Sequence, residues 1–223
     1  MLLASFTTAA PARAEGAARK PFTADERARL AQGELVTRPV TEERGDLRLM
    51  GGTSWQVIAA PPEAVYRAIQ DTAHYPQILP TVSRAQLVSE HAALRRVRLE
   101  HKKGPLGVAY RLALQFRHAE RDMTYKLNDP LESGMRAAWG FCSVRPYAGG
   151  KSLVTWGIMV DPGEGLMVGL VRGLIHEWIL KTPWQMRRFI ESKQGQALYG
   201  FTLVTGAGAA RQLDGGQLEK RAP

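Results

Sequence analysis

The sequence is poor in cysteine, and this scarcity excludes two kinds of structural cross-link. Cys142 is the only cysteine among the 223 residues, so the chain can form neither an intrachain disulfide nor a zinc cluster built from several cysteines. It lies in the apolar, strand-like run AAWGFCSV. We therefore interpret Cys142 as a packed small hydrophobic side chain rather than as a nucleophile.

Long apolar runs and the common catalytic motifs are also missing. A membrane-spanning helix needs about 18 consecutive apolar residues, whereas the nearest run, LMVGLVRGLIHEWIL, is interrupted by Arg172, His176 and Glu177. No histidines stand in an H-x-x-x-H or H-E-x-x-H arrangement. The sequence likewise has no glycine-rich phosphate loop after a strand and no nucleophile elbow. It therefore indicates no metal site and no cofactor.

Acidic residues are outnumbered by basic ones. Lys and Arg number 30 against 21 Asp and Glu, which gives a net charge of +9 and favours anionic partners. The most basic segment, LRRVRLEHKK, alternates charged with apolar residues. That period of two is typical of the solvated face of an antiparallel strand rather than of a nucleic-acid site. We expect transient contact with an anionic membrane surface and no nucleic acid partner, and the sequence leaves the oligomeric state open.

The first residues, MLLASFTTAAPARAEGAARK, combine a short apolar run with a possible cleavage site. Ala12-Arg13-Ala14 has the small-x-small form that signal peptidase recognises. We predict a signal peptide over residues 1–14 and export to the periplasm or the exterior. The segment lacks the positive charge that opens a signal peptide, so an uncleaved leader on a cytoplasmic protein is the alternative.

The sequence after this leader predicts one α+β domain over residues 51–193. Before it, residues 15–50 are predicted to form an extension with one short helix, because Thr23 can cap a helix that Gly33 ends. Alternation and turn residues predict seven antiparallel strands, one at residues 51–60 and six between residues 82 and 161. Short connections make neighbouring strands antiparallel.

Two kinds of helix are predicted around this sheet. In IAAPPEAVYRAIQDTAHYPQILP, Pro61 stops the strand and Pro62 suits the first turn of a helix. Further prolines keep the next helix short. Helical spacing then predicts a long C-terminal helix from about residue 163 to residue 192, kinked at Pro183. Residues 194–223, rich in Gly, Ala and charge, predict a flexible tail.

A sheet with one apolar face needs a cover, and one helix about 10 Å wide cannot fill its concave side. We therefore predict a cavity between the sheet and the helices. Alternation assigns the following side chains to its wall: Trp55, Val57, Val97, Leu99, Val108, Tyr110, Leu112, Leu114, Phe116, Tyr125, Trp139, Phe141, Trp156 and Ile158. A slip of one residue would invert the assignment of a whole strand.

The long helix supplies the remaining candidate wall residues. Gly169 and Gly173 continue a row of glycines at a spacing of four, which leaves room for a ligand or for close contact with the sheet, unless they are merely tolerated. Leu166 and Leu170 share its apolar side. Glu177 is either a polar anchor for a ligand or part of a solvated helix face.

Acid–base chemistry has one weak set of candidates. Alternation places Tyr110, His101 and His118 on the inward face, where a tyrosine and a histidine together could transfer protons. The alternative is that each has a polar tip satisfied by backbone or water.

The order of elements resembles the START-like (SRPBCC) helix-grip superfamily. The motifs that carry this resemblance are APPEAVY, the D-x-x-x-YP-x-x-LP step from Asp71 to Pro80, and the helix opened by DPGEGL. The superfamily includes polyketide cyclases and dehydrases, lipid-transfer START domains and coenzyme-Q-binding proteins, and the last of these are the nearest. The resemblance implies a seven-stranded antiparallel sheet wrapped around a long C-terminal helix, with two short helices after the first strand.

The same resemblance implies that the chain binds and transports a hydrophobic small molecule. A lipid, a sterol-like molecule, a quinone or a polyketide-class compound would suit such a cavity. The alternatives are a polyketide cyclase or dehydrase acting on a bound aromatic or polyketide substrate, and an interaction module that holds no ligand. We expect carriage rather than catalysis, because the residues supply no catalytic motif.

Overall fold

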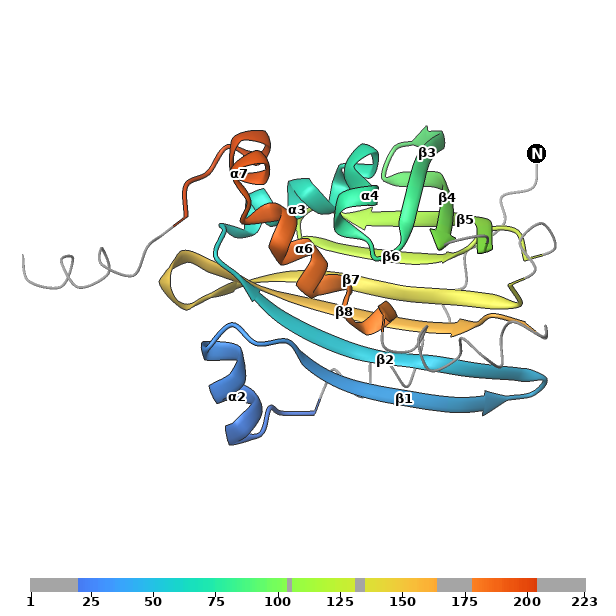
Figure 1. The fold of residues 1–223 in the computed structure, drawn as a ribbon, viewed down its shortest axis with the longest axis horizontal. Helices are drawn as coiled ribbons and strands as arrows, with labels where there is room; N and C mark the ends of the chain where they lie inside the picture. Colours follow the sequence, from blue (N-terminus) through green and yellow to red (C-terminus); the bar gives the residue numbers. More distant parts are fainter. Residues whose placement is uncertain (1–19, 104–105, 131–134, 164–177, 204–223) are drawn as a thin grey trace, which may run out of the picture.

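The computed structural model describes residues 20–103, 106–130, 135–163 and 178–203. Within these residues one strongly bent antiparallel sheet dominates the fold, as Figure 1 shows. Its strands follow the order β1-β2-β8-β7-β6-β5-β4-β3. The strands are β1 (Val36–Arg44), β2 (Leu47–Ile58), β3 (Val82–His91), β4 (Leu94–Lys103), β5 (Leu106–Arg117), β6 (Asp122–Leu127), β7 (Ala137–Tyr147) and β8 (Lys151–Asp161). The fold is therefore α+β, as the sequence predicted.

The described sheet has eight strands, so the prediction of seven was wrong. The additional strand, β1, pairs with β2 along its whole length, from Val36 opposite Trp55 to Arg44 opposite Leu47. It had been assigned to the N-terminal extension, and its sequence VTRPVTEER contains a proline and several charges. Proline is tolerated here because β1 is an edge strand, where one row of backbone N–H groups has no partner to lose.

The strand-to-helix step and the N-terminal helix form as predicted. Helix α3 (Pro62–Gln70) follows β2 with Pro62 in its first turn, and η1 (Thr72–His74) and α4 (Tyr75–Ile78) come next. Helix α2 (Ala24–Ala31) begins at Thr23, whose side chain accepts from the backbone N–H of Glu26 while Glu26 reaches back to Thr23. This reciprocal capping box satisfies donors that a helix start leaves free.

The long C-terminal helix is not confirmed, since residues 164–177 lie outside the described residues. Residues 178–180 are helical, a turn follows, and α6 (Thr182–Ile190) begins again. Pro183 has no N–H to give to the carbonyl oxygen of Ile179, and the Thr182 hydroxyl donates to that oxygen at 3.0 Å instead. The helical path is therefore interrupted beside Pro183, where a kink was predicted.

The predicted start of the flexible tail at residue 194 was wrong. Helix α7 (Lys193–Tyr199) occupies this segment, with the Ser192 side chain capping its start and Gly200 in a left-handed conformation after its end. The Tyr199 side chain is 4% exposed, so a helix with a buried aromatic residue lies at the start of the segment that was predicted to be a flexible tail. The predicted signal peptide, residues 1–14, lies outside the described residues.

The two faces of the sheet carry different cores. Helices α3 and α6 contact the strands from one side, which we call the inner face, and α4 packs between α6 and β3 (Figure 1). Trp55 and Val57 instead pack with Leu30 of α2 on the opposite, outer face. Trp139 and Phe141 also lie on the outer face, beside Leu49 and Met159. All four residues had been assigned to the inner face. That assignment was wrong, because the inward positions of β2 and β7 are shifted by one residue from the predicted ones.

The error in β7 has a packing cause. The inner side of β7 carries the small residues Ala138, Gly140 and Cys142, because the large rings of Tyr125 and Trp156 occupy the inner face beside them. The large side chains of β7 are left to the outer face.

None of the helices among the described residues has the length and apolar character that crossing a bilayer requires.

Candidate functional site: an apolar cavity under the helices

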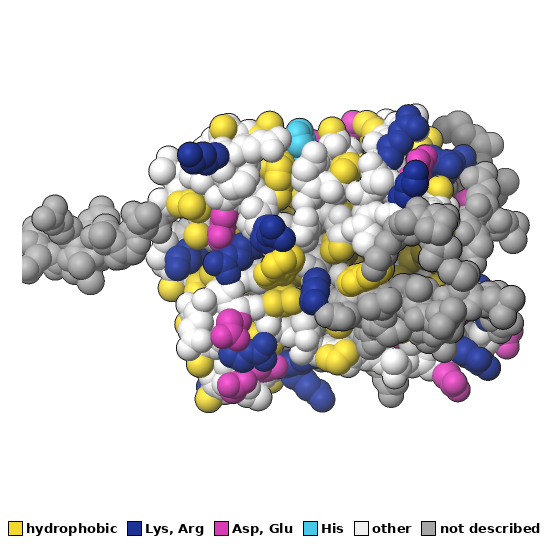
Figure 2. All heavy atoms as spheres, viewed as in Figure 1, with side chains coloured by type: hydrophobic (Ala, Val, Ile, Leu, Met, Phe, Trp, Pro, Cys, Tyr) yellow, Lys and Arg dark blue, Asp and Glu magenta, His cyan; other side chains and the backbone are white. Residues whose placement is uncertain are grey.

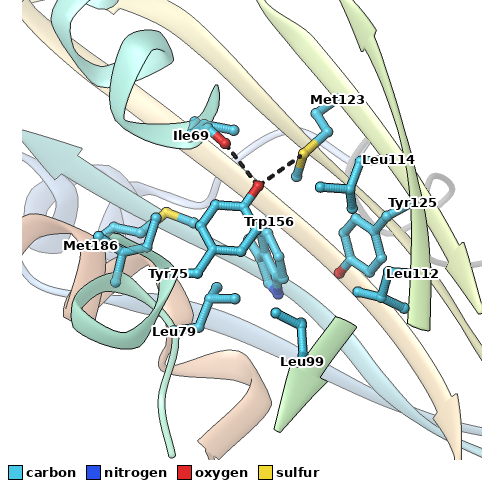
Figure 3. A pocket seen from close by; sticks show the side chains of 11 residues that line it. Ile69, Tyr75, Leu79, Leu99, Leu112, Leu114, Met123, Tyr125, Trp156 and Met186 are labelled. Carbon is cyan, nitrogen blue, oxygen red and sulfur yellow. Dashed lines mark hydrogen bonds between the residues drawn. The ribbon is translucent and has the colours of Figure 1, made fainter. Parts of the chain in front are cut away.

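A cavity lies between the inner face of the sheet and the helices above it (Figure 3). Its wall combines residues of four strands with residues of α3, α4 and α6. They are Ile69, Tyr75, Ile78, Leu79, Leu99, Leu112, Leu114, Met123, Tyr125, Trp156 and Met186. None of these side chains carries a charge, so the wall favours an apolar occupant.

The cavity measures about 20 Å³, which is room for about one water molecule. Sites for drug-sized ligands have volumes of about 300 to 1,000 Å³. The described conformation is therefore nearly closed, and a larger ligand has to displace wall side chains. Met123 and Met186 have flexible, unbranched side chains, and Leu79 is only half-buried, which makes these three the wall residues best able to move.

Several residues predicted from alternation do meet at this cavity. Leu99, Leu112, Leu114, Tyr125 and Trp156 line it. Val97 and Phe116 are buried in the same core, and Tyr110 and Ile158 pack against that core. Val108 is 41% exposed and contributes no buried wall. Leu166, Gly169, Leu170, Gly173 and Glu177 lie outside the described residues.

Six wall residues were missing from the predicted set: Ile69, Tyr75, Ile78, Leu79, Met123 and Met186. Five of them come from the helices or the turn after α4; no wall residues had been assigned to the short helices, and those assigned to the long C-terminal helix all lay before residue 178. A signal was present in the sequence for Ile69, because it shares an apolar stripe of α3 with Val65 and Ala68. Met123 lies two residues from Tyr125 and so shares its face of β6.

Glycine in β7 permits the aromatic arrangement in the wall. A Cβ atom on Gly140 would collide with the Tyr125 ring and with the carbonyl oxygen of Gly157. Without it, Tyr125 lies across β7 and donates its hydroxyl to the Gly157 oxygen at 3.0 Å. Its ring stacks on Trp156 with 5.0 Å between centroids. Tyr125 therefore holds the indole of Trp156 in a fixed orientation.

The tyrosine hydroxyls of the wall already have partners. Tyr75 donates to the carbonyl oxygen of Ile69 at 2.8 Å and its oxygen lies 3.9 Å from the Met123 sulfur, contacts drawn in Figure 3. Burial raises the pKa of the Tyr75 and Tyr125 phenols well above the ordinary value. Both phenols are therefore protonated donors at neutral pH and serve the fold rather than proton transfer.

His101 and Tyr110 form a hydrogen-bonded pair close to the cavity. His101 Nε2 lies 2.7 Å from the Tyr110 hydroxyl, and His101 Nδ1 lies 2.8 Å from the Thr81 hydroxyl. Tyr110 is the register partner of Leu99, which lines the cavity. Burial lowers the pKa of His101 to about 4 and raises that of Tyr110. At neutral pH both groups are uncharged, and neither pKa is near the value that efficient acid–base catalysis needs.

His118, the other histidine candidate, belongs to a different part of the molecule. It lies in the exposed turn after β5, with Nδ1 3.5 Å from the Tyr66 hydroxyl and its ring stacked on Phe116. The structure thus joins Tyr110 to His101 and leaves His118 apart.

Among the described residues no group of His, Cys, Asp and Glu side chains is arranged to hold a metal ion.

A second hollow lies at the tip of the β1–β2 hairpin. It measures about 570 Å³ and is lined by Glu43, Gly45, Asp46, Arg48 and Arg136. These residues offer no apolar wall, so this larger hollow is a surface depression rather than a site for a hydrophobic molecule. On the face shown in Figure 2, basic side chains of the described residues lie at several separate places with acidic side chains among them.

The family described as polyketide cyclase / dehydrase and lipid transport matches residues 52–182, which is more than half of the chain. The chain belongs to this family. It is thus a START-like helix-grip protein, as the sequence resemblance predicted. No curated protein matches the chain significantly in sequence.

Solved structures share the fold of this family member at low sequence identity. A fragment of the STAR-related lipid transfer protein of Xanthomonas axonopodis gives a TM-score of 0.55 at 15% identity, over 70% of this chain and 99% of that chain. A protein of Thermus thermophilus gives a TM-score of 0.53 at 18% identity, over 61% of this chain and 90% of that chain. The Zhui aromatase/cyclase of a Streptomyces species gives a TM-score of 0.51 at 12% identity, over 69% of this chain and 90% of that chain. These likenesses establish the fold.

Proposed function

We propose that this protein binds a hydrophobic small molecule between the inner face of its sheet and helices α3, α4 and α6, and carries it between membranes. The observation that supports this most directly is the uncharged wall, in which every described lining side chain is aliphatic, aromatic or a thioether. Membership of a family that includes lipid transport supports the same proposal. Lipids, sterol-like molecules, quinones and polyketides are the ligand classes that fit.

The hydrophobic effect supplies enough free energy for such binding. Burying roughly 300 to 400 Å² of apolar ligand surface at ~25 cal/mol per Å² gives about 7 to 10 kcal/mol before association costs. Part of that gain is spent on opening the closed cavity. Helix α4 is one turn long and α6 packs on it, so an outward shift of these two helices, together with movement of wall side chains, would enlarge the space.

A cavity-filling substitution tests this proposal. Leu79 is a half-buried wall residue, and we expect Leu79→Trp to occupy the cavity and lower affinity for a hydrophobic probe at least about tenfold, since the added ring competes for the same volume. Leu198→Trp is the matched control, because Leu198 is 45% exposed on α7. Titration with 1-methylnaphthalene in a calorimeter measures both variants, and their melting temperatures show that each is folded.

Native mass spectrometry of the purified protein addresses the natural ligand. A hydrophobic molecule that co-purifies unchanged supports carriage. Absence of any bound molecule, together with equal probe affinity in Leu79→Trp and Leu198→Trp, would refute ligand binding in this cavity.

The second candidate function is a cyclase or dehydrase acting on a bound polyketide-like substrate. The observation that favours it is the 2.7 Å contact between His101 and Tyr110 beside the cavity. The low pKa of His101, about 4, weighs against it at neutral pH. Turnover of a polyketide substrate that Tyr110→Phe abolishes, while probe binding persists, would favour the enzyme over the carrier.

A further inference from the structure

Two buried polar atoms at neighbouring positions on the inner face of the sheet have no hydrogen-bond partner among the described residues. They are the indole Nε1 of Trp156 and the hydroxyl oxygen of Ser54. The two residues are 6% and 0% exposed, so solvent does not satisfy them either. Most buried polar groups in proteins are hydrogen-bonded, and those that are not call for a specific explanation.

The two atoms belong to neighbouring positions of the sheet. Ser54 of β2 and Trp156 of β8 are register partners, and side chains of such a pair leave the same face with Cβ atoms about 4.5 to 5.5 Å apart. Trp156 lines the cavity. In Figure 3 its indole nitrogen points away from the Tyr75 hydroxyl, toward the end of the cavity at Leu99. Ser54 is therefore next to Trp156 on the inner face, and the unpartnered nitrogen of Trp156 is directed toward one end of the apolar space.

The N–H of Trp156 is available to a ligand, whereas the other polar groups of the described wall are not. The Tyr125 hydroxyl is committed to the Gly157 carbonyl and the Tyr75 hydroxyl to that of Ile69. Stacking on Tyr125 also fixes the plane of the indole. The donor is thus oriented before any ligand arrives, which reduces the entropy lost on binding.

We propose that Ser54 and Trp156 form a hydrogen-bonding subsite for a neutral oxygen group of the ligand, a hydroxyl or a carbonyl. This inference rests on the proposed function. An indole N–H can only donate, while a serine hydroxyl donates or accepts, so the pair fits an oxygen that accepts from Trp156. An ammonium group has no lone pair to accept that hydrogen bond. A carboxylate would be buried against a wall in which no described side chain is charged.

The expected ligand is therefore largely apolar with an alcohol, ketone or ester oxygen near one end. The matched probes 1-naphthol and 1-methylnaphthalene test this, because they differ by exchange of a hydroxyl for a methyl group. We expect the protein to bind 1-naphthol at least about fivefold more tightly, since the methyl group leaves both buried polar atoms unpaired. 1-Naphthoate should bind more weakly than 1-naphthol.

Substitutions assign the preference to the two residues. Ser54→Ala and Trp156→Phe each remove one polar atom, and we expect each to lower the preference for 1-naphthol to about twofold or less. Ser143→Ala and Trp139→Phe make the same changes on the outer face of the sheet, and Trp139 Nε1 is likewise unpartnered. Both controls should keep the preference. Melting temperatures verify folding, and Ser54→Ala suffices if Trp156→Phe does not fold.

The possible results separate this inference from the proposed function. If neither naphthalene binds, the proposed function fails and the subsite with it. If both bind with equal affinity, the cavity binds ligands but the subsite is refuted, and a bound water satisfies the two atoms. A preference that survives Ser54→Ala and Trp156→Phe, or that disappears equally in the outer-face controls, also refutes the subsite.

Discussion

Gly140 shows how one missing side chain decides the shape of the cavity wall. Because Gly140 has no Cβ atom, Tyr125 can reach across β7 to the carbonyl of Gly157. Tyr125 in turn orients Trp156. A strand glycine is normally unfavourable, and here it is required by the close approach of a ring and a backbone oxygen.

We predict that Gly140→Ala destabilises the protein by about 1 to 3 kcal/mol, because the added methyl group collides with the Tyr125 ring and with the backbone oxygen of Gly157. Gly107→Ala is the control: the nearest atom to its added Cβ is the His101 carbonyl oxygen at 3.5 Å, an ordinary contact. Urea unfolding measures both free energies. Equal stability of Gly140→Ala and the wild type would contradict the role assigned to Gly140.

His101 makes stability depend on pH in a defined direction. Its pKa is lowered from 6.5 to about 4 by burial, so between these values the unfolded chain binds more protons than the folded one. Stability therefore rises with pH across this window and falls as the solution is acidified from pH 7 to pH 4. Between pH 7 and pH 4 we expect the free energy of unfolding to fall by about 1 to 3 kcal/mol less in His101→Gln than in the wild type.

Urea unfolding at several pH values between 7 and 4 measures this contribution as a difference between wild type and variant. Glutamine can keep hydrogen bonds to Thr81 and Tyr110 while losing the titration. Parallel pH profiles for the two proteins would show that His101 is not the group responsible.

At the scale of elements, α7 extends the folded unit beyond its predicted end. The Tyr199 side chain packs against Phe189 of α6 with ring centroids 6.3 Å apart and donates to Asp71 at 3.3 Å. Arg67 of α3 donates to the Tyr199 carbonyl oxygen. Helix α7 therefore ties α3 to α6, the two longest helices described above the cavity.

We predict that a chain ending at Leu203 is as stable as the whole protein, whereas a chain ending at Ser192 loses about 3 to 5 kcal/mol, comparable to deleting a large buried aromatic side chain. Thermal unfolding followed by circular dichroism compares the two. If truncation at Ser192 left the melting temperature unchanged, α7 would not be part of the cooperative unit.

At the scale of the whole molecule, the sequence carries a net charge of +9, and on the face shown in Figure 2 the described basic side chains lie among acidic ones. Trp184 is 40% exposed on α6 with the Arg188 guanidinium 4.8 Å from its ring, an arrangement of aromatic and basic groups that suits a membrane–water interface. Basic side chains that lie among acidic ones predict weak, reversible contact with anionic membranes, which suits the proposed carriage of a ligand.

We predict stronger binding to vesicles containing phosphatidylglycerol than to phosphatidylcholine vesicles, and weaker binding as salt rises, because exposed charges are screened over about 8 Å at physiological ionic strength. Arg188→Ala should weaken binding only about fivefold, the contribution of one basic residue near the surface. Co-sedimentation measures all three effects. Equal binding to both vesicle types would exclude an electrostatic membrane contact.

The sequence by itself determined the features that depend on nearby residues. Thr23 and Glu26 define the start of α2, Pro61 and Pro62 turn β2 into α3, and Pro183 marks a helix break, because capping and the missing proline N–H act within one helical turn. Alternation also identified the inner side of β4, β5, β6 and β8. These strands carry large apolar residues mainly on one face.

Only the tertiary structure decided which face of β2 and β7 is inner, because both strands carry apolar side chains on each face and a local pattern then gives no direction. The rings of Tyr125 and Trp156 fill the inner face, so Trp139 and Phe141 pack on the outer one. Tertiary pairing also made a strand of β1 despite its proline. It brought Ser54 beside Trp156 across the sheet, a contact between residues too distant in sequence for any local pattern to encode.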